Sequence, residues 1–167
     1  LFQDDWLAVT ENIWSHSGIQ QGTEVHNLVR FEQAGSIVPQ HEGTVSTMIV
    51  TPGENGAVHA VADLTPAYGG DPAVQSWQRT LDFARRTLTI DDRFALGSGT
   101  QAIFEVNVPV QPSISGDTAT AGALKLRVIS PADATLHAVD WTTVDSDYLS
   151  GWRIDIGGGT TGYVVEL

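Results

Sequence analysis

Hydrophobic and polar residues alternate with a period of two along much of the chain. In residues 102–110 every even-numbered position is apolar, while the odd-numbered positions include Glu105 and Asn107. Because successive side chains of a strand point to opposite faces, this alternation predicts a half-buried strand. Similar patterns predict strands in the windows 23–32, 44–51, 57–64, 87–91, 123–130, 134–141, 151–156 and 162–167. In 44–51 apolar residues occupy both faces, so we expect both faces to be at least half buried.

Residues 74–84 fit two patterns. Four apolar residues fall at helical spacing: Val74, Trp77, Leu81 and Ala84. The same stretch alternates in 81–83, and the alternation resumes in 88–90 with its phase shifted by one residue. A β-bulge or a tight corner near Ala84–Arg86 would produce that shift. We favour strands here, with a helix as the alternative.

The predicted elements point to one fold class. Roughly nine or ten strands, with turn residues roughly every 8–15 positions, are typical of an antiparallel sandwich. The glycine-rich stretch 157–162 is predicted to join 151–156 to 162–167 as a hairpin. We therefore expect an all-β protein, an antiparallel two-sheet β-sandwich over residues 23–167. Residues 1–22 are expected to be an N-terminal extension or edge segment.

The composition narrows the possible partners. The 167 residues include 8 Lys or Arg, 20 Asp or Glu and no cysteine, which gives a net charge of −12. Nucleic acid and anionic membranes attract basic faces, so neither is an expected partner. The lack of cysteine excludes disulfides, thiolate metal sites and a cysteine nucleophile. Because the chain starts at Leu1 and its single methionine is Met48, we expect a processed or excised piece.

The five histidines form no recognisable metal motif. They stand at positions 16, 26, 41, 59 and 137. His59 and Asp63 share a face of one predicted strand, but a rise of ~3.3 Å per residue separates them by roughly 13 Å, too far to bind one ion. A structural divalent metal, held by histidines from different strands, is possible but is not supported by the spacing. We therefore predict no metal ligands and no cofactor.

Basic residues are concentrated near Trp77. Four of the eight fall within fifteen positions: Arg79, Arg85, Arg86 and Arg93. A guanidinium binds a carboxylate or sulfate through two parallel hydrogen bonds, and a tryptophan ring packs on the apolar face of a sugar. Together these side chains suit an acidic saccharide. An ion-paired strand face is the alternative, because three acidic residues are interleaved: Asp82, Asp91 and Asp92.

Four short motifs follow one another along the chain: EVHN at 24–27, VADLTPAYG at 61–69, WQRTL at 77–81 and LTIDDRF at 88–94. Their order and spacing resemble the β-sandwich region of heparinase II/III-like polysaccharide lyases. The resemblance covers about residues 20–167 and is strongest in 58–94. From the residues alone, His26 is either a ligand-facing histidine beside the amide of Asn27 or a strand histidine with an internal hydrogen bond.

The resemblance implies roles for five residues. In such lyases an α/α toroid supplies much of the cleft, and the sandwich contributes a histidine to it. The reaction is a β-elimination at a uronic acid, which needs a base, a partner for the carboxylate and a proton donor for the leaving oxygen. The implied catalytic residues are His26, as base or carboxylate partner, and Tyr68, as proton donor. The implied substrate-binding residues are Asn27, Trp77 and Arg79. The histidine–aspartate set that holds a structural metal in some relatives is not matched here.

The resemblance thus implies the sandwich region of a secreted or periplasmic bacterial uronate-polysaccharide lyase. Its expected partners are an acidic polysaccharide and an α/α-toroid domain on the same or another chain. Elimination needs groups held on both sides of the sugar, so we expect little or no cleavage without the toroid. Two alternatives remain: a structural sandwich, and a non-catalytic carbohydrate-binding module whose platform is drawn from Trp6, Trp14, Trp77, Trp141 and Trp152.

Overall fold

A computed structural model describes residues 1–3, 5–8, 23–140 and 151–167. Strands make up 58% and helices 7% of it, in two antiparallel sheets of eight and five strands that do not close into a barrel. The predicted fold class, an all-β two-sheet sandwich, is confirmed. The sequence favours this class because Val, Thr and alternating apolar residues suit pleated strands, and glycines suit the turns between them.

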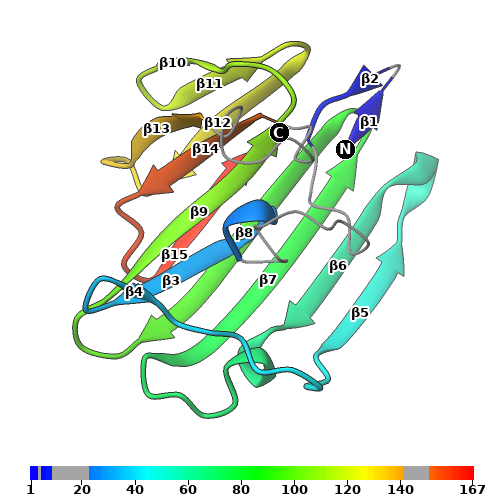
Figure 1. The fold of residues 1–167 in the computed structure, drawn as a ribbon. Coiled ribbons are helices and arrows are strands. Elements are labelled where there is room, and N and C mark those ends of the chain that lie inside the picture. Colours follow the sequence, from blue (N-terminus) through cyan, green and yellow to red (C-terminus); the bar gives the residue numbers. More distant parts are fainter. Residues whose placement is uncertain (4, 9–22, 141–150) are drawn as a thin grey trace. The chain divides into compact units, whose positions relative to one another are not determined.

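The eight-stranded sheet has the order β10-β11-β12-β15-β8-β7-β6-β5. In chain order its strands are β5 (Thr47–Pro52), β6 (Val58–Asp63), β7 (Val74–Ala84), β8 (Thr87–Leu96), β10 (Ser113–Ser115), β11 (Thr118–Ala121), β12 (Leu124–Ser130) and β15 (Gly162–Glu166). Strands β5, β6, β7 and β8 run side by side as successive hairpins (Figure 1).

The five-stranded sheet has the order β13-β14-β9-β3-β4. Its strands are β3 (Val29–Gln33), β4 (Ser36–Ile37), β9 (Thr100–Val108), β13 (Thr135–Asp140) and β14 (Trp152–Gly157). The remaining elements are the short pair β1 (Phe2–Gln3) and β2 (Asp5–Trp6), and three 3-10 turns: η1 (Thr23–Val25), η2 (Glu54–Gly56) and η3 (Thr65–Tyr68).

The chain divides into two compact units, each assembled from three segments. The first unit comprises Leu1–Arg30, Ile103–Arg127 and Ala134–Gly158. The second unit comprises Phe31–Ala102, Val128–Asp133 and Gly159–Leu167. The core of the first unit is built from alternate residues of β9 and β14, such as Val106 and Ile154, which are 1% and 0% exposed.

The core of the second unit is centred on Phe31. Its ring makes edge-to-face contacts with three aromatic rings at centroid distances of 5.4 Å each: Tyr68, Trp77 and Phe94. Such geometry places the positive ring edge on the negative ring face and adds to the burial of large apolar surface. The alternating residues Trp77 of β7 and Phe94 of β8 are cross-strand partners, so the hairpin delivers both rings to the same face.

Residues 74–96 form a hairpin of two strands, as favoured from the alternation. Ala84 pairs with Thr87, so Arg85 and Arg86 are the turn. Arg85 has a φ of 60°, in the left-handed region. The shift in phase is therefore the expected tight corner, because the turn reverses the chain and brings 81–83 opposite 88–90 on one face.

The window 44–51 forms a strand, but the prediction of its burial is wrong. All six residues of β5 are exposed. The strand lies at the end of its sheet, and the described residues bury neither of its faces. The pattern of residues 44–51 therefore located the strand correctly. Whether the strand is buried depends on which other elements pack against it, and the pattern does not show that.

The predicted hairpin across 157–162 is also wrong. β14 lies between β13 and β9, whereas β15 lies between β12 and β8 in the other sheet. The start of β15 is fixed instead by Tyr163, whose hydroxyl oxygen accepts the Gly159 N–H at 3.0 Å. A Cβ atom on Gly159 would lie 2.4 Å from the Tyr163 ring, so glycine is required for this close approach.

The window 23–32 begins as a turn. Residues 23–25 form η1, and the strand starts only at Val29. The three apolar residues of the predicted inner face are nevertheless all fully buried: Val25, Val29 and Phe31. The short turn thus keeps the apolar pattern while it presents the polar residues that follow it, His26 and Asn27.

Candidate functional site

The five predicted site residues fall in both units. His26 and Asn27 belong to the first unit, whereas Tyr68, Trp77 and Arg79 belong to the second. Of the tryptophans offered as a sugar platform, Trp14 and Trp141 lie outside the described residues. Trp152 is half-buried.

Tyr68 and Trp77 are part of the aromatic core of the second unit. Tyr68 is 0% exposed and Trp77 is 2% exposed, which leaves no open ring face for a sugar to stack on. The Trp77 indole N–H donates to Asp92 Oδ1 at 2.7 Å. Burial raises the pKa of the Tyr68 hydroxyl above its ordinary value of 10.0. Its hydroxyl oxygen lies 3.5 Å from the Gln40 side-chain nitrogen.

The Arg79 guanidinium is bound to Asp92. Its Nε donates to Asp92 Oδ1 at 2.9 Å and its Nη2 to Oδ2 at 2.7 Å, a bidentate pair. Asp92 is 0% exposed, and the Arg79 guanidinium also lies over the Trp77 ring, 5.5 Å from its centroid. The carboxylate that this arginine holds is thus an internal one, which fits the ion-paired alternative described above.

His26 and Asn27 lie on a turn that is anchored to β9. The His26 N–H donates to the Thr23 carbonyl at 3.2 Å, and its own carbonyl accepts the Leu28 N–H at 3.1 Å. Asn27 Oδ1 accepts the backbone N–H of Asn107 at 2.7 Å. The Leu28 carbonyl accepts the Glu105 N–H at 2.8 Å. Both His26 and Asn27 are half-buried.

A buried charge network occupies the same part of the first unit. It consists of four side chains: Arg30, Glu105, Arg153 and Asp155. Arg153 Nε lies 3.2 Å from Glu105 Oε1, and Arg30 Nη2 lies 3.6 Å from Asp155 Oδ2. Arg30 also pairs with Glu105, and Arg153 with Asp155. Glu105 is 0% exposed and both arginines are under 10% exposed.

The sequence analysis did not single out this network. Its members sit at the polar positions of the alternating windows 23–32, 102–110 and 151–156. A charged residue at such a position ordinarily faces solvent, so the pattern alone gave no reason to bury it. Only cross-strand pairing joins them, since Asp155 lies opposite Glu105 and Arg153 opposite Asn107.

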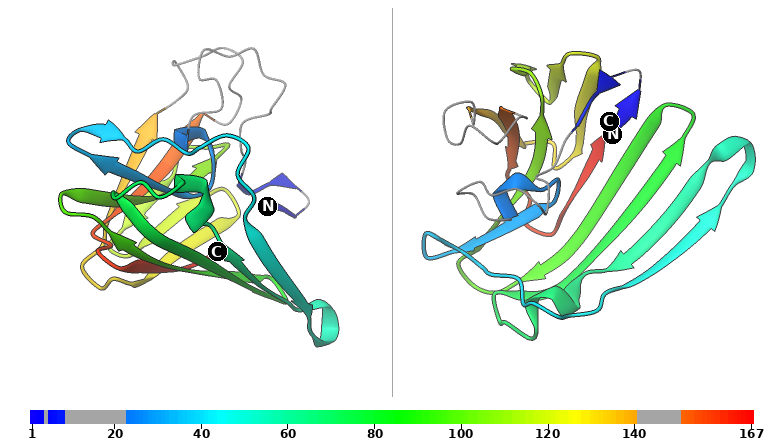
Figure 2. Two further views of the ribbon diagram at one scale, coloured as in Figure 1. Left: turned by 90° about the horizontal axis from the view of Figure 1, so that it is seen from below. Right: turned by 45° about the vertical axis from the view of Figure 1, so that its right-hand side comes forward.

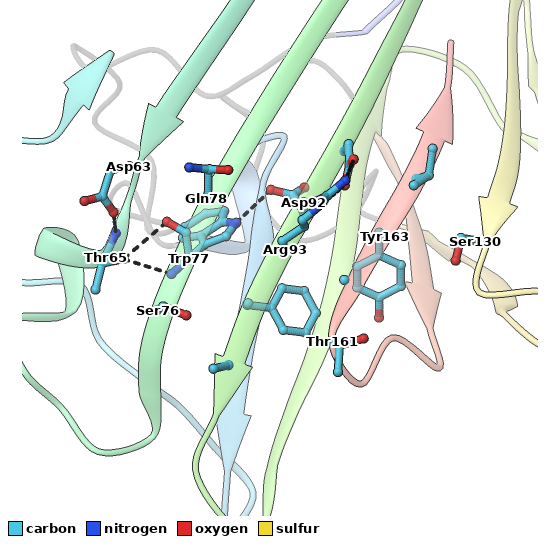
Figure 3. A pocket seen from close by; sticks show the side chains of 15 residues that line it. Asp63, Thr65, Ser76, Trp77, Gln78, Asp92, Arg93, Ser130, Thr161 and Tyr163 are labelled. Atoms are coloured by element: carbon cyan, nitrogen blue, oxygen red, sulfur yellow. Dashed lines mark hydrogen bonds and ion pairs between the residues drawn. The ribbon is translucent and has the colours of Figure 1, made fainter. Parts of the chain in front are cut away.

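The second unit carries an open groove of about 740 Å³ on its sheet (Figure 3). A cross-strand row runs along it, because Asp63 lies opposite Gln78, Gln78 opposite Arg93, and Arg93 opposite Gly162. Cross-strand partners share a face of the sheet, so these side chains stand on the side opposite Trp77 and Asp92. Gly162 and Val164 of β15 also line the groove.

The groove carries both signs of charge. Arg93 binds Asp91 through two contacts, Nε to Oδ1 at 3.3 Å and Nη2 to Oδ2 at 3.0 Å. Asp63 Oδ1 accepts the Thr65 N–H at 3.0 Å. Two carboxylates against one guanidinium leave the groove acidic, so its hydrogen-bonding groups suit hydroxyl groups better than a polyanion.

No group of three or more metal-binding side chains occurs among the residues that the structure describes. His59 pairs instead with Asp82, at 2.6 Å between Nδ1 and Oδ1. Within the described part of the chain, no helix is long and apolar enough to cross a membrane. A scan against protein-family models found no match, and a search of curated proteins found none either.

Proposed function

We propose that this chain is the β-sandwich region of a secreted uronate-polysaccharide lyase, to which it contributes His26 and Asn27. The observation that carries the proposal is the anchored turn. It holds a half-buried imidazole beside an amide whose oxygen is fixed by the Asn107 N–H at 2.7 Å. A base and a hydrogen-bond donor must both be held in place for catalysis, and two hydrogen bonds to β9 supply that support.

The chemistry assigns a task to each residue. Neutral imidazole is a suitable base near neutral pH, so His26 would take the proton from C5 of the uronate. The Asn27 amide group would donate to the uronate carboxylate and stabilise the charge that develops there. The electron pair left at C5 forms a double bond to C4 as the bond from C4 to the glycosidic oxygen breaks. That oxygen takes its proton from an acid that another domain supplies.

The buried network favours this location for a polyanion. Arg30 and Arg153 offset the charges of Glu105 and Asp155, so the network adds no net charge beside the turn. Elsewhere the chain is strongly acidic, with a net charge of −12. Buried ion pairs with several contacts also hold their strands in a fixed register. The network therefore provides a rigid and locally neutral support for His26 and Asn27.

Under this proposal Tyr68, Trp77 and Arg79 stabilise the second unit. Their mutual contacts and their burial account for them without a substrate. Asn27 then serves the substrate carboxylate, and the proton donor is contributed from outside the five residues named from the sequence. This division agrees with the expectation that the chain cleaves little or nothing by itself.

The proposal is tested by nuclear magnetic resonance of the chain during titration with oligosaccharides of alginate, heparan sulfate and hyaluronan. We expect one of them to shift the ring signals of His26 and the side-chain amide signals of Asn27. His26→Ala should weaken binding, whereas His59→Ala, at an exposed histidine paired with Asp82, should leave it unchanged. Unsaturated product, measured by ultraviolet absorbance, should form slowly or not at all.

Two results would contradict the proposal. The first is that none of the three uronate oligosaccharides perturbs the signals of residues 26 and 27. The second is that His59→Ala weakens binding as much as His26→Ala, since that would place the polysaccharide elsewhere on the surface.

The groove of the second unit favours a second candidate, a carbohydrate-binding module for neutral sugars. Its row of Asp63, Gln78 and Arg93 offers donors and acceptors at the spacing of adjacent strands. Titration with neutral oligosaccharides should then shift the Gln78 side-chain amide signals, and Gln78→Ala should abolish the effect. Arg127→Ala, at an exposed ion pair outside the groove, is the matched control. Unchanged signals at Gln78 with every neutral sugar would exclude this candidate.

A further inference from the structure

Strand β5 presents an open edge of the eight-stranded sheet. Its six residues are all exposed, and Met48, Ile49 and Val50 are 63%, 71% and 50% exposed. Within the described residues, no strand pairs with the side of β5 that faces away from β6 (Figure 2). Edge strands of stable proteins are ordinarily protected by charges, bulges or prolines along the strand. Residues 43–53 contain no charged residue, and Pro52 stands at the very end of β5.

The hairpin fixes which backbone groups face the open side. The Gly53 N–H donates to the Ala57 carbonyl at 2.8 Å, so Gly53 points its polar groups toward β6. Successive residues of an antiparallel strand point these groups to alternate sides. Thr51, Ile49 and Thr47 therefore also point toward β6, while Pro52, Val50 and Met48 point to the open side. Pro52 has no backbone N–H to donate. Because its position points to the open side, the pairing of β5 with β6 loses no hydrogen bond.

This arrangement is complementary to itself. When two β5 strands meet antiparallel about a twofold axis at Ile49, Met48 of one copy lies opposite Val50 of the other. Both residues point their N–H and carbonyl groups outward, so the two symmetric pairs form four backbone hydrogen bonds. On one face Met48 then contacts Val50, and on the other Ile49 contacts its own counterpart. All three side-chain contacts, two between Met48 and Val50 and one between the two Ile49 side chains, bring apolar groups together, which is a favourable case for cross-strand pairs.

We propose that β5 is an interface at which two copies of this chain join into one continuous antiparallel sheet. The absence of charge in 43–53 matters because the chain as a whole carries −12, so an uncharged edge lets two copies approach with less repulsion. The exposed side chains of Val58 and Phe83 continue the apolar surface on the two neighbouring strands. Because each copy uses the same edge, the pairing closes at two and leaves no free β5 edge.

A single introduced cysteine tests the register directly, since the chain has none of its own. Ile49 pairs with its counterpart outside the hydrogen-bonded rings, where Cα atoms are about 4.5 Å apart, within the range that a disulfide spans. Ile49→Cys should therefore give a covalent dimer under mild oxidation. Thr51→Cys is the matched control on the same strand and face, because four residues of offset place its two Cα atoms roughly 13 Å apart.

Sedimentation tests the association without a covalent link. The chain should sediment as a dimer of 17.9 kDa copies at micromolar concentration. Ile49→Lys would place two ammonium groups on the axis and should give a monomer with an unchanged circular dichroism spectrum. Ile129→Lys, at an apolar residue that is 48% exposed outside this edge, should remain dimeric. The proposal is overturned if the chain is monomeric, if Thr51→Cys crosslinks as readily as Ile49→Cys, or if Ile129→Lys dissociates the dimer and Ile49→Lys does not.

Discussion

Two regions of the second unit both carry apolar residues on predicted strands but differ in their surroundings. Around Phe31, the alternating residues of β7 and β8 are buried, as Trp77 and Phe94 show with 2% and 5% exposure. At the β5 edge, the consecutive apolar residues Met48, Ile49 and Val50 are 50–71% exposed. Both regions are made of long antiparallel hairpins in one sheet. The difference shows that the strand pattern reflects backbone geometry, whereas burial depends on what packs on the strand.

Truncation of phenylalanine in each region should show the difference most strongly. Phe31→Ala removes the ring at the centre of three edge-to-face contacts and should lower the free energy of unfolding by about 3–5 kcal/mol. Phe83→Ala, at a ring that is 39% exposed, should cost only about 1–2 kcal/mol. Urea unfolding followed by tryptophan fluorescence measures both. Equal losses would mean that Phe83 is covered in solution by a part of the chain or by another molecule.

The ion pairs of the two regions give a parallel contrast. Asp92→Ala removes a fully buried carboxylate that accepts hydrogen bonds from Arg79 and from the Trp77 indole, so we expect a loss of about 3–5 kcal/mol. Asp82→Ala breaks an exposed pair with His59 and should cost less than about 1 kcal/mol. The same unfolding experiment applies. A loss at Asp92 as small as that at Asp82 would show that the bidentate pair with Arg79 is not formed.

These contrasts define how far the sequence alone could predict the structure. The alternation in 102–110 and 123–130 correctly predicted strands, because period two follows from backbone geometry. It could not tell that β14 and β15 lie in different sheets, since the turn between them depends on the contact of Gly159 with the Tyr163 ring. It also missed the short strands β10 and β11, whose three and four residues are too few to show a period.

The candidate site was less predictable than the fold. Trp77 and the arginines near it suggested a sugar clamp, with an ion-paired strand face as the alternative, and the strand register makes Arg79 and Asp92 direct partners. A sequence does not show which charged side chains contact each other. An arginine that binds a ligand and an arginine that binds an internal aspartate therefore give the same sequence pattern. The network of Arg30, Glu105, Arg153 and Asp155 shows the converse, because residues from three separate windows meet only through the sheet.

The stability of the buried region should also depend on pH, through the hydroxyl of Tyr163. Burial raises the pKa of Tyr163 to about 12, and its hydroxyl donates to the Ala102 carbonyl at 2.7 Å. The folded state therefore favours the neutral phenol. This contribution is complete below the ordinary tyrosine pKa of about 10 and is lost as the pH rises toward about 12. The full loss amounts to roughly 2–3 kcal/mol.

The check is the free energy of unfolding across that alkaline range for the chain and for Tyr163→Phe. The variant should be less stable than the chain near neutral pH by about 1 kcal/mol, since the bonds to Gly159 and Ala102 are gone. It should then lose less stability as the pH rises. Tyr68 shifts in the same direction, so a smaller decline is expected to persist. Parallel curves for the two proteins would contradict the assignment to Tyr163.

The smallest expected effect lies in the hairpin turns of the two regions. The β5–β6 turn places its positive φ angles on Asn55 and Gly56, residues that adopt them readily. The β7–β8 turn instead places Arg85 at a φ of 60°. Arg85→Gly should relieve this strain and raise the free energy of unfolding by about 0.5–1 kcal/mol, after allowance for the greater freedom of glycine in the unfolded chain. Arg86→Gly, at a turn residue without a positive φ, should bring no gain. If both variants change stability by the same amount, then the loss of a positive charge, rather than the backbone conformation of Arg85, is the cause.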